Sequence, residues 1–422
     1  MRRHGMHRPR SDPVRYDRRH HAARHTDEYV FHQLLPYLGN KRHLLDVIGE
    51  ALDATGLRPY DSTFVDAFAG SGVVSRFAKQ RGFQVVSNDW EPYAQVLNTA
   101  AIACDGPPAC TALGGYEAAI ATLNALPGVD GWVTRHLCPA DDAAPDPTHE
   151  RLFYRRATGR RIDAIRACIA EWQQNGHVDT AGAACLLAPL LYQACWLANT
   201  SGVFKGFHAG WGGSNGTALH RILADLWLSP QRFLANDRGH RVLCTDAMHL
   251  HQELPARPDV VYVDPPYNQH PYASNYHVLN SLVVWDRPDL PPPSERGWKA
   301  AIRPDWRERR SPFNDRRAAA GAFARLLDRL DAPWLLVSYS TDGTIPLEDF
   351  VTAAADRGAL RVFCRSYKRY RTSPTRPSPR PRNVEFVLNI DTRRRDGGAA
   401  TNALAEIRAC ADEVDAAGRD GT

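Results

Sequence analysis

The sequence predicts an α/β protein built on a parallel sheet, and two features of the 422-residue chain support this prediction. First, residues 63–66, 83–87 and 259–263 are short apolar runs, typical of strands that are buried on both faces of a sheet. Second, a helix is predicted over 73–81, between the first two of these runs. Strands that alternate with helices in this way are typical of a doubly wound parallel sheet.

Further elements follow along the chain. Residues 161–172 and 181–196 have apolar spacing of three and four, which predicts two helices in the middle of the chain. Residues 287–312 are rich in Pro and Arg and predict a loop. The last part of the chain is predicted to contain helices over 315–330 and 347–357, strands over 334–338 and 383–390, and a short helix near its end.

A loop rich in glycine follows the first predicted strand. It runs from Asp66 to Gly72 as Asp-Ala-Phe-Ala-Gly-Ser-Gly, so the backbone can approach a ligand closely. No Lys-Ser or Lys-Thr pair follows it, which excludes a phosphate-binding P-loop. Asp89 comes at the end of the next strand, about 20 residues on, where a doubly wound fold places a carboxylate on ribose hydroxyls. The pattern alone fits either a dinucleotide or S-adenosylmethionine.

The most specific motif is Asp264-Pro265-Pro266-Tyr267, directly after the strand predicted over 259–263. The prolines fix the backbone and remove two donors, so the turn presents carbonyl acceptors. Asp264 adds a carboxylate acceptor and Tyr267 a flat face for stacking. This combination suits a planar amine such as the exocyclic nitrogen of a nucleobase, because two acceptors can turn its lone pair towards an electrophile. Without the glycine loop, the same residues would also fit an ordinary proline-rich turn.

Taken in order, these motifs resemble those of the Dam-like N6-adenine-specific DNA methyltransferases. Five more segments are similar to motifs of that family: Tyr37 to Arg42, 199–204 with 210–213, 243–246, 275–277 and 383–390. The resemblance spans roughly residues 36–390. It implies an α/β, Rossmann-like S-adenosylmethionine-dependent methyltransferase fold with an inserted, mainly helical target-recognition region.

The resemblance also implies how the chain is divided. The catalytic domain is expected in two parts, over 31–103 and 236–392, with the target-recognition insertion between them over 104–235. Residues 1–30, rich in Arg and His, are expected to form a disordered basic extension, and 393–422 a C-terminal tail. A secretory signal is not expected, because the start of the chain lacks an apolar run.

Catalytic roles are carried over from the family by resemblance. Asp264 and the Pro265 carbonyl are expected to accept the hydrogens of the target amine, and Pro266 completes the motif. Tyr267 is expected to stack on an adenine that is flipped out of the duplex. The methyl group is then transferred in line from S-adenosylmethionine to the N6 nitrogen, and no metal is expected to take part.

Cofactor contacts are likewise implied by the resemblance. Asp89 is expected to bind the ribose of S-adenosylmethionine and Asp246 its adenine amine, although Asp246 also fits a helix N-cap. Lys41 is expected to approach the cofactor, although it also fits an exposed surface lysine. The other residues expected to bind the cofactor are Tyr37, Gly39, Asp66, Phe68, Ala69, Gly70 and Gly72.

Phosphate contacts are expected from a basic segment near the end of the chain. Residues 361–382 contain eight Arg or Lys and no acid, and Lys368, Arg369 and Arg371 are the candidates for DNA binding. A solvated loop fits the same composition equally well. Residues 303–317 contain six Arg but also three acids, which favours a solvated surface there.

Composition adds weaker constraints. The net charge of +5 favours a polyanionic partner only slightly. Nine cysteines without a CxxC pair argue against zinc and for free thiols. No apolar run approaches the roughly 20 residues of a membrane span, so no membrane association and a cytoplasmic location are expected.

Two other functions stay open on the sequence alone. An RNA base amine methyltransferase can also pair a glycine loop with Asp-Pro-Pro and an aromatic residue, but it usually keeps the two motifs close. Here Asp66 and Asp264 are about 200 residues apart. A non-catalytic DNA-binding module would leave Asp264 and Tyr267 without a purpose. The expected substrate is therefore adenine in double-stranded DNA, and a cognate restriction endonuclease is considered as a partner.

Overall fold

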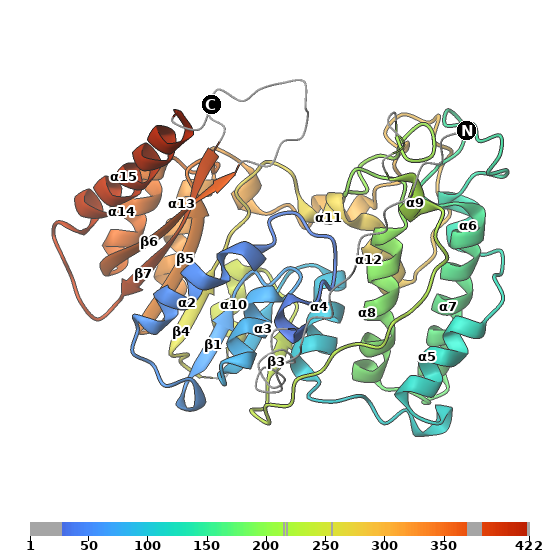
Figure 1. Ribbon diagram of the computed structural model, residues 1–422, viewed down its shortest axis with the longest axis horizontal. Coiled ribbons are helices and arrows are strands. Elements are labelled where there is room, and N and C mark those ends of the chain that lie inside the picture. Colours follow the sequence, from blue (N-terminus) through green and yellow to red (C-terminus); the bar gives the residue numbers. More distant parts are fainter. Residues whose placement is uncertain (1–27, 214–215, 217, 255, 369–381, 420–422) are drawn as a thin grey trace, which may run out of the picture.

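A computed structural model describes residues 28–419, apart from 214–215, 217, 255 and 369–381 (Figure 1). Its centre is a seven-stranded sheet in the order β3-β2-β1-β4-β5-β7-β6. Helices cover both faces of the sheet, and a second group of helices stands on the side of β3 and α4 (Figure 1). The extension expected over 1–30 lies almost entirely outside the described residues.

Five strands of the sheet run parallel to one another. They are β3 (Arg241–Leu243), β2 (Gln84–Asn88), β1 (Thr63–Asp66), β4 (Val260–Val263) and β5 (Trp334–Ser340). Every residue of β4 and β5 is buried, as expected for strands covered on both faces. The chain places β2 and β3 on one side of β1, and β4 and β5 on the other. Such a switch point is where doubly wound folds bind ligands.

The other end of the sheet is antiparallel. β7 (Arg382–Asp391) lies between β5 and β6 (Ala359–Lys368) and runs antiparallel to both. The register pairs Glu385 with Ser340, so the glutamate stands level with the carboxyl end of β5.

The two faces of the sheet pack against separate hydrophobic cores. Phe64 and Tyr262 point into the larger core, to which α2 (Leu45–Asp53) and α3 (Val73–Gln80) contribute. The alternate residue Val65 points into the second core, as the two-residue period of a strand requires. The helices on that face are α10 (Leu250–Glu253), α13 (Ala319–Arg329), α14 (Leu347–Arg357) and α15 (Ala399–Arg419).

The second group of helices follows β2. It begins at α4 (Pro92–Asn98) and a π-helical turn, and continues through α5 (Tyr116–Ala125), α6 (Trp132–Leu137), α7 (Arg156–Gln174), α8 (Thr180–Trp196) and α9 (Leu219–Ile222). We call α5 to α9 the helical group. No helix in the described ranges has the length and apolar character needed to cross a membrane.

Two helices that come after β4 pack against the helical group. They are α11 (Tyr272–Asn275) and α12 (His277–Val284). Arg166 of α7 donates to the carbonyls of Leu282 and Val283 at the end of α12, at 2.6 and 3.2 Å. Arg151 donates to the carbonyl of Trp298 at 2.8 Å, which attaches the following loop to the same group.

Most predicted elements are confirmed, with shifted ends. The helix predicted over 315–330 begins at Ala319, because the Asp315 carboxylate accepts the Arg317 amide and closes a turn there. The terminal helix is longer than predicted, at 21 residues. Ala403 and Ile407 recur on one of its faces and pack into the second core. No individual helix was predicted at α4, α5 or α6, although the insertion was expected to be mainly helical.

Candidate active site

A pocket of about 930 Å³, partly open to solvent, lies at the carboxyl ends of β1, β2, β3 and β4. We call it the cofactor pocket, since most residues expected to bind the cofactor line it. The sequence-predicted residues in its lining are Tyr37, Gly39, Lys41, Asp66, Phe68, Ala69, Gly70, Asp89, Asp246, Asp264, Pro265, Pro266 and Tyr267. The fold therefore brings five separate segments of the chain to one edge of the sheet.

The two glycines of the loop after β1, Gly70 and Gly72, have different roles. Gly70 has a φ of +51°, and a Cβ added there would lie 2.8 Å from the ring of Tyr37. Only glycine therefore fits between the loop and that ring. Gly72 has a φ of +76° at the N-cap of α3, and a side chain there would overlap the amide of Asn98. Gly72 is not part of the pocket lining, and its packing explains the glycine.

Two carboxylates anchor the glycine loop. Ser75 donates to Oδ2 of Asp66 at 2.7 Å, and burial raises the pKa of Asp66 to about 7. The two oxygens of Asp89 accept the backbone amides of Gly70 at 2.7 Å and of Glu91 at 2.9 Å. A carboxylate offers about four acceptor positions, so Asp89 keeps capacity for a ligand on the pocket side.

Asp246 lies at the β3 side of the pocket. Its Oδ1 accepts the amide of Met248 at 3.0 Å, so the N-cap alternative is confirmed, and the residue also lines the pocket. The side chain of Asn88 bonds both the amide and the carbonyl of Thr245 at 3.1 Å. These two bonds hold the ends of β2 and β3 together as one wall.

Lys41 and Asp264 form a buried ion pair in the pocket, with Nζ 2.8 Å from Oδ2. Lys41 is 5% exposed, so the surface-lysine alternative is wrong. Burial lowers the pKa of Lys41, but the Asp264 carboxylate outweighs this effect and the lysine stays charged. Burial also raises the pKa of Asp264, and Lys41 opposes that rise.

The second oxygen of Asp264 is left open. Oδ1 is buried and has no hydrogen-bond partner among the described residues. A buried acceptor without a partner costs about 1–3 kcal/mol, and such atoms are retained mainly at functional sites. Lys41 also donates to the Gly39 carbonyl at 3.3 Å and lies 5.0 Å from the centre of the Tyr267 ring. The lysine thus holds Asp264 and Tyr267 in place and leaves one oxygen of Asp264 available to a ligand.

Three tyrosines surround Tyr37. Tyr276 belongs to the segment 275–277 that resembles a family motif, whereas Tyr93 and Tyr272 were not predicted. The ring of Tyr37 stacks on those of Tyr272 and Tyr276, with centroids 5.3 and 5.1 Å away. The hydroxyls of Tyr37 and Tyr93 are 3.2 Å apart, and Tyr276 accepts the Leu38 amide at 3.0 Å. This cluster joins the segment 37–42 to the helices α11 and α12, which follow Tyr267 in the chain. Tyr93 and Tyr272 stand alone in the sequence without a recognisable spacing, which explains why they were missed.

The loop that contains the segments 199–204 and 210–213 is attached to residues that follow Tyr267 in the chain. The amide of Phe204 donates to the Asn275 carbonyl at 2.7 Å, and the Phe204 carbonyl lies 2.9 Å from Nε2 of His277. Burial lowers the pKa of His277 to about 4, so the ring is neutral and Nε2 donates. The side chain of Asn199 accepts the Gly212 amide at 3.1 Å and shapes the loop. No residue of this loop lines the cofactor pocket.

The two basic segments of the sequence, 361–382 and 303–317, differ in what the structure shows of them. Lys368 ends β6, whereas Arg369 and Arg371 lie outside the described residues. The solvated surface expected over 303–317 is wrong for Arg309. This arginine lines the cofactor pocket and pairs with Asp305 at 2.9 Å. Its spacing of four from that acid was the available signal.

Comparison with known proteins defines the class. The sheet order and the pocket at its switch point are those of a methyltransferase fold that uses S-adenosylmethionine. The family model of D12 class N6 adenine-specific DNA methyltransferases matches residues 37–128 and 148–290. This is more than half of the chain, which therefore belongs to that family. It is a site-specific DNA methyltransferase that acts on the N6 amine of adenine.

Individual relatives agree with this family. The chain is 28% identical over 351 residues to the Type II methyltransferase M.NlaIII of Neisseria lactamica, across 83% of this chain and 96% of that protein. It is 27% identical to the Type II methyltransferase M.CviAII of Paramecium bursaria Chlorella virus 1, across 79% and 92%. It is 25% identical to the Type II methyltransferase M.FokI of Planomicrobium okeanokoites, but spans only 52% of that protein's length. No solved structure matches the chain.

Proposed function

We propose that S-adenosylmethionine binds in the cofactor pocket and that Asp264, Pro265 and Tyr267 hold the target adenine beside it. The observation that carries this proposal is the buried Oδ1 of Asp264, an acceptor without a partner in the pocket lining. An adenine amine supplies the missing donor. The hydroxyls and amines of the cofactor are also donors, and they suit the carboxylates of Asp89 and Asp246.

The reaction then depends mainly on positioning. S-adenosylmethionine supplies a methyl group on a positively charged sulfur. Flipping the adenine costs a few kcal/mol, and stacking on Tyr267 returns about 1–3 kcal/mol. Oδ1 of Asp264 and the Pro265 carbonyl accept the two amine hydrogens, so the N6 lone pair turns towards the methyl carbon. The C–N bond forms as the C–S bond breaks, and Asp264 is the nearest base for the proton that the nitrogen releases.

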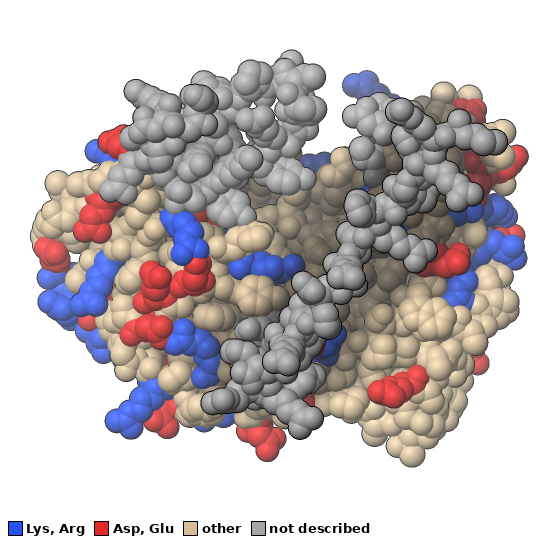
Figure 2. Space-filling model, in the orientation of Figure 1, with Lys and Arg blue, Asp and Glu red and all other residues tan. Residues whose placement is uncertain are grey.

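Target recognition is assigned to the insertion over 104–235, between catalytic parts over 31–103 and 236–392. Support comes from the place where the insertion begins: it leaves the sheet after the carboxyl end of β2, at the edge that carries the pocket. In the view of Figure 2 the surface is hollowed between the sheet and the helical group, which suits a duplex substrate. Lys368, Arg369 and Arg371 are proposed to contact phosphates, and residues 393–422 are proposed as a tail.

A restriction endonuclease is proposed as the biological partner. The relatives support this, because M.NlaIII and M.FokI carry the name Type II methyltransferase and the LlaI enzyme of Lactococcus lactis the name modification methylase. A cytoplasmic location is proposed because the substrate is DNA.

The test is methyl transfer from radiolabelled S-adenosylmethionine to duplex DNA, single-stranded DNA and RNA, followed by identification of the modified base. We expect N6-methyladenine in duplex DNA at one sequence context. Label on RNA alone would overturn the substrate. Transfer to duplex DNA that Asp264→Ala leaves unchanged would overturn the assignment of the site.

A further inference from the structure

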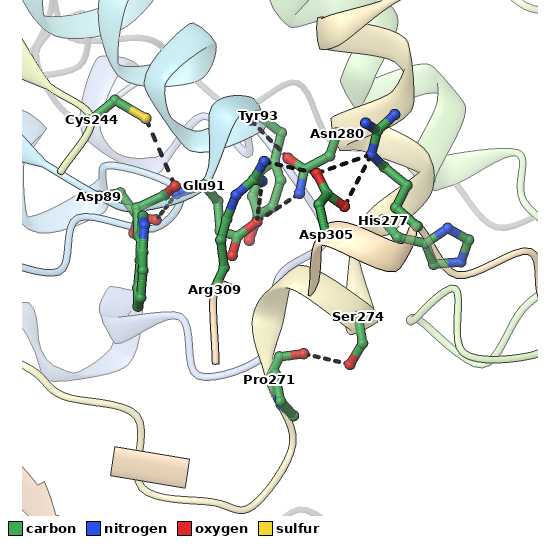
Figure 3. Close-up of polar contacts among 12 residues, drawn as sticks. Asp89, Glu91, Tyr93, Cys244, Pro271, Ser274, His277, Asn280, Asp305 and Arg309 are labelled. Atoms are coloured by element: carbon green, nitrogen blue, oxygen red, sulfur yellow. Dashed lines mark hydrogen bonds and ion pairs between the residues drawn. The ribbon is translucent and has the colours of Figure 1, made fainter. Parts of the chain in front are cut away.

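Glu91 and Arg309 face each other at one end of the cofactor pocket (Figure 3). Glu91 follows β2, is 5% exposed, and its Oε2 accepts a hydrogen bond from Asn280 of α12 at 2.6 Å. Nη1 of Arg309 lies 3.9 Å from the same oxygen. At that distance the charges attract but no hydrogen bond forms, so the guanidinium keeps a donor available for a third group.

Arg309 is held in place by a chain of ion pairs. Its Nη2 lies 2.9 Å from Asp305, which also receives Nε of Arg303 at 3.3 Å (Figure 3). Arg303 in turn binds both oxygens of Asp286, just after α12, at 2.8 and 2.9 Å. A bidentate arginine–carboxylate pair fixes orientation as well as charge. Arg309 is therefore a preorganised part of the pocket wall, with its side chain 21% exposed.

We propose that Glu91 and Arg309 bind the adenosine half of the cofactor, a contact that rests on the cofactor pocket being the S-adenosylmethionine site. Both residues lie at the β2 and β3 side of the pocket, with Asp89 and Asp246. The Lys41–Asp264 pair lies on the β4 side, where the methyl group is transferred. Glu91 accepts from a hydroxyl or amine of the nucleoside, and Arg309 donates to a ring nitrogen or a ribose oxygen.

A phosphate-binding role for Arg309 fits the geometry less well. Its positive charge is already paired with the carboxylate of Asp305 and faces that of Glu91, so little of the charge is left to attract a DNA phosphate. The neutral, polar edge of a nucleoside needs only the hydrogen-bond donor that Arg309 keeps available. Burial raises the pKa of Glu91 to about 7, because little water reaches this carboxylate in the pocket wall.

The experiment is calorimetric titration of the full chain with S-adenosylmethionine and with S-adenosylhomocysteine. The two ligands share the adenosine half and differ in the transferred methyl group and its charge. Arg309→Gln and Glu91→Gln are each expected to weaken both ligands equally, by about tenfold, as for a lost hydrogen bond to a charged group. Arg307→Gln is the matched control, because Arg307 lies in the same loop, exposed, over the ring of Trp306, and it should change neither affinity.

Three outcomes distinguish this contact from the pocket assignment itself. If Asp89→Ala weakens both ligands and Arg309→Gln and Glu91→Gln do not, the contact is wrong and the pocket stands. If none of these variants changes either affinity, the pocket assignment fails as well. If Arg309→Gln weakens only duplex DNA binding, Arg309 is a phosphate contact and the inference is overturned. Arg309→Lys keeps the charge without the fork and should lose nearly as much cofactor affinity as Arg309→Gln, which separates hydrogen bonding from charge.

Discussion

The cofactor pocket and the helical group treat their buried carboxylates in opposite ways. In the helical group, Asp163 accepts the amides of Val133 and Thr134 and the hydroxyl of Thr134, all at 2.7–2.8 Å. In the pocket, Oδ1 of Asp264 and Oδ1 of Asp66 have no partner among the described residues. The carboxylate of Asp163 is therefore satisfied by hydrogen bonds within the fold. The open oxygens of Asp264 and Asp66 lower stability and are available to ligands.

The largest effect should come from removing the open acceptor. Asp264→Ala is expected to lower the single-turnover rate by at least 10²-fold, because the lost contact acts mainly in the transition state. Its affinity for S-adenosylmethionine should stay near that of the parent chain, whereas its melting temperature should fall, because Lys41 loses the partner of its buried ion pair. Methylation by the purified variant at more than a tenth of the parent rate would contradict the role of Asp264.

The matched change in the helical group should lower stability without affecting the pocket. Asp163→Ala leaves three donors without an acceptor, and we expect the free energy of unfolding to fall by about 2 kcal/mol. Denaturant titration would measure this loss. Below the melting transition, cofactor affinity should be unchanged, since Asp163 does not line the pocket. A variant of normal stability would show that those three hydrogen bonds contribute little.

The same contrast explains what the sequence could predict. The pocket is made of short motifs at the ends of strands, so Asp66, Asp89 and Asp264 were recognisable from local order alone. The helical group is held by contacts between distant residues, such as Arg166 with the end of α12. Such pairs leave no periodic or local pattern. Arg309 was missed although Asp305 lies four residues before it, since its loop reaches the pocket only in the folded chain.

Lys41 offers a finer test of the pocket, because it balances the buried Asp264. In Lys41→Met, no lysine charge opposes the rise that burial causes in the pKa of Asp264, so this pKa should rise further. The ionised form that accepts the amine hydrogens then forms only at higher pH. We expect the acid limb of the single-turnover rate to move up by about one pH unit, at saturating cofactor and DNA. An unmoved limb would mean that Lys41 does not control the charge of Asp264.

The smallest expected effect concerns Glu91, whose pKa rises from its ordinary value of 4.5 to about 7, mainly through burial. The folded chain therefore binds this proton more tightly than the unfolded chain. The stability that this tighter proton binding contributes is fully present below pH 4.5 and is lost as the pH rises through 7. Glu91→Gln keeps an acceptor for Asn280 but cannot ionise, so it escapes this loss.

Without cofactor, Glu91→Gln should therefore gain stability relative to the parent chain between pH 5 and pH 8, on the order of 1 kcal/mol. The full pKa shift would give more, but Arg309 and Asn280 readjust when the charge is removed. Asp66 titrates near pH 7 in both chains, so the difference between the chains isolates Glu91. Thermal unfolding at both pH values measures it. A constant difference would mean that Glu91 is ionised throughout, which would place it with the satisfied carboxylates of the helical group.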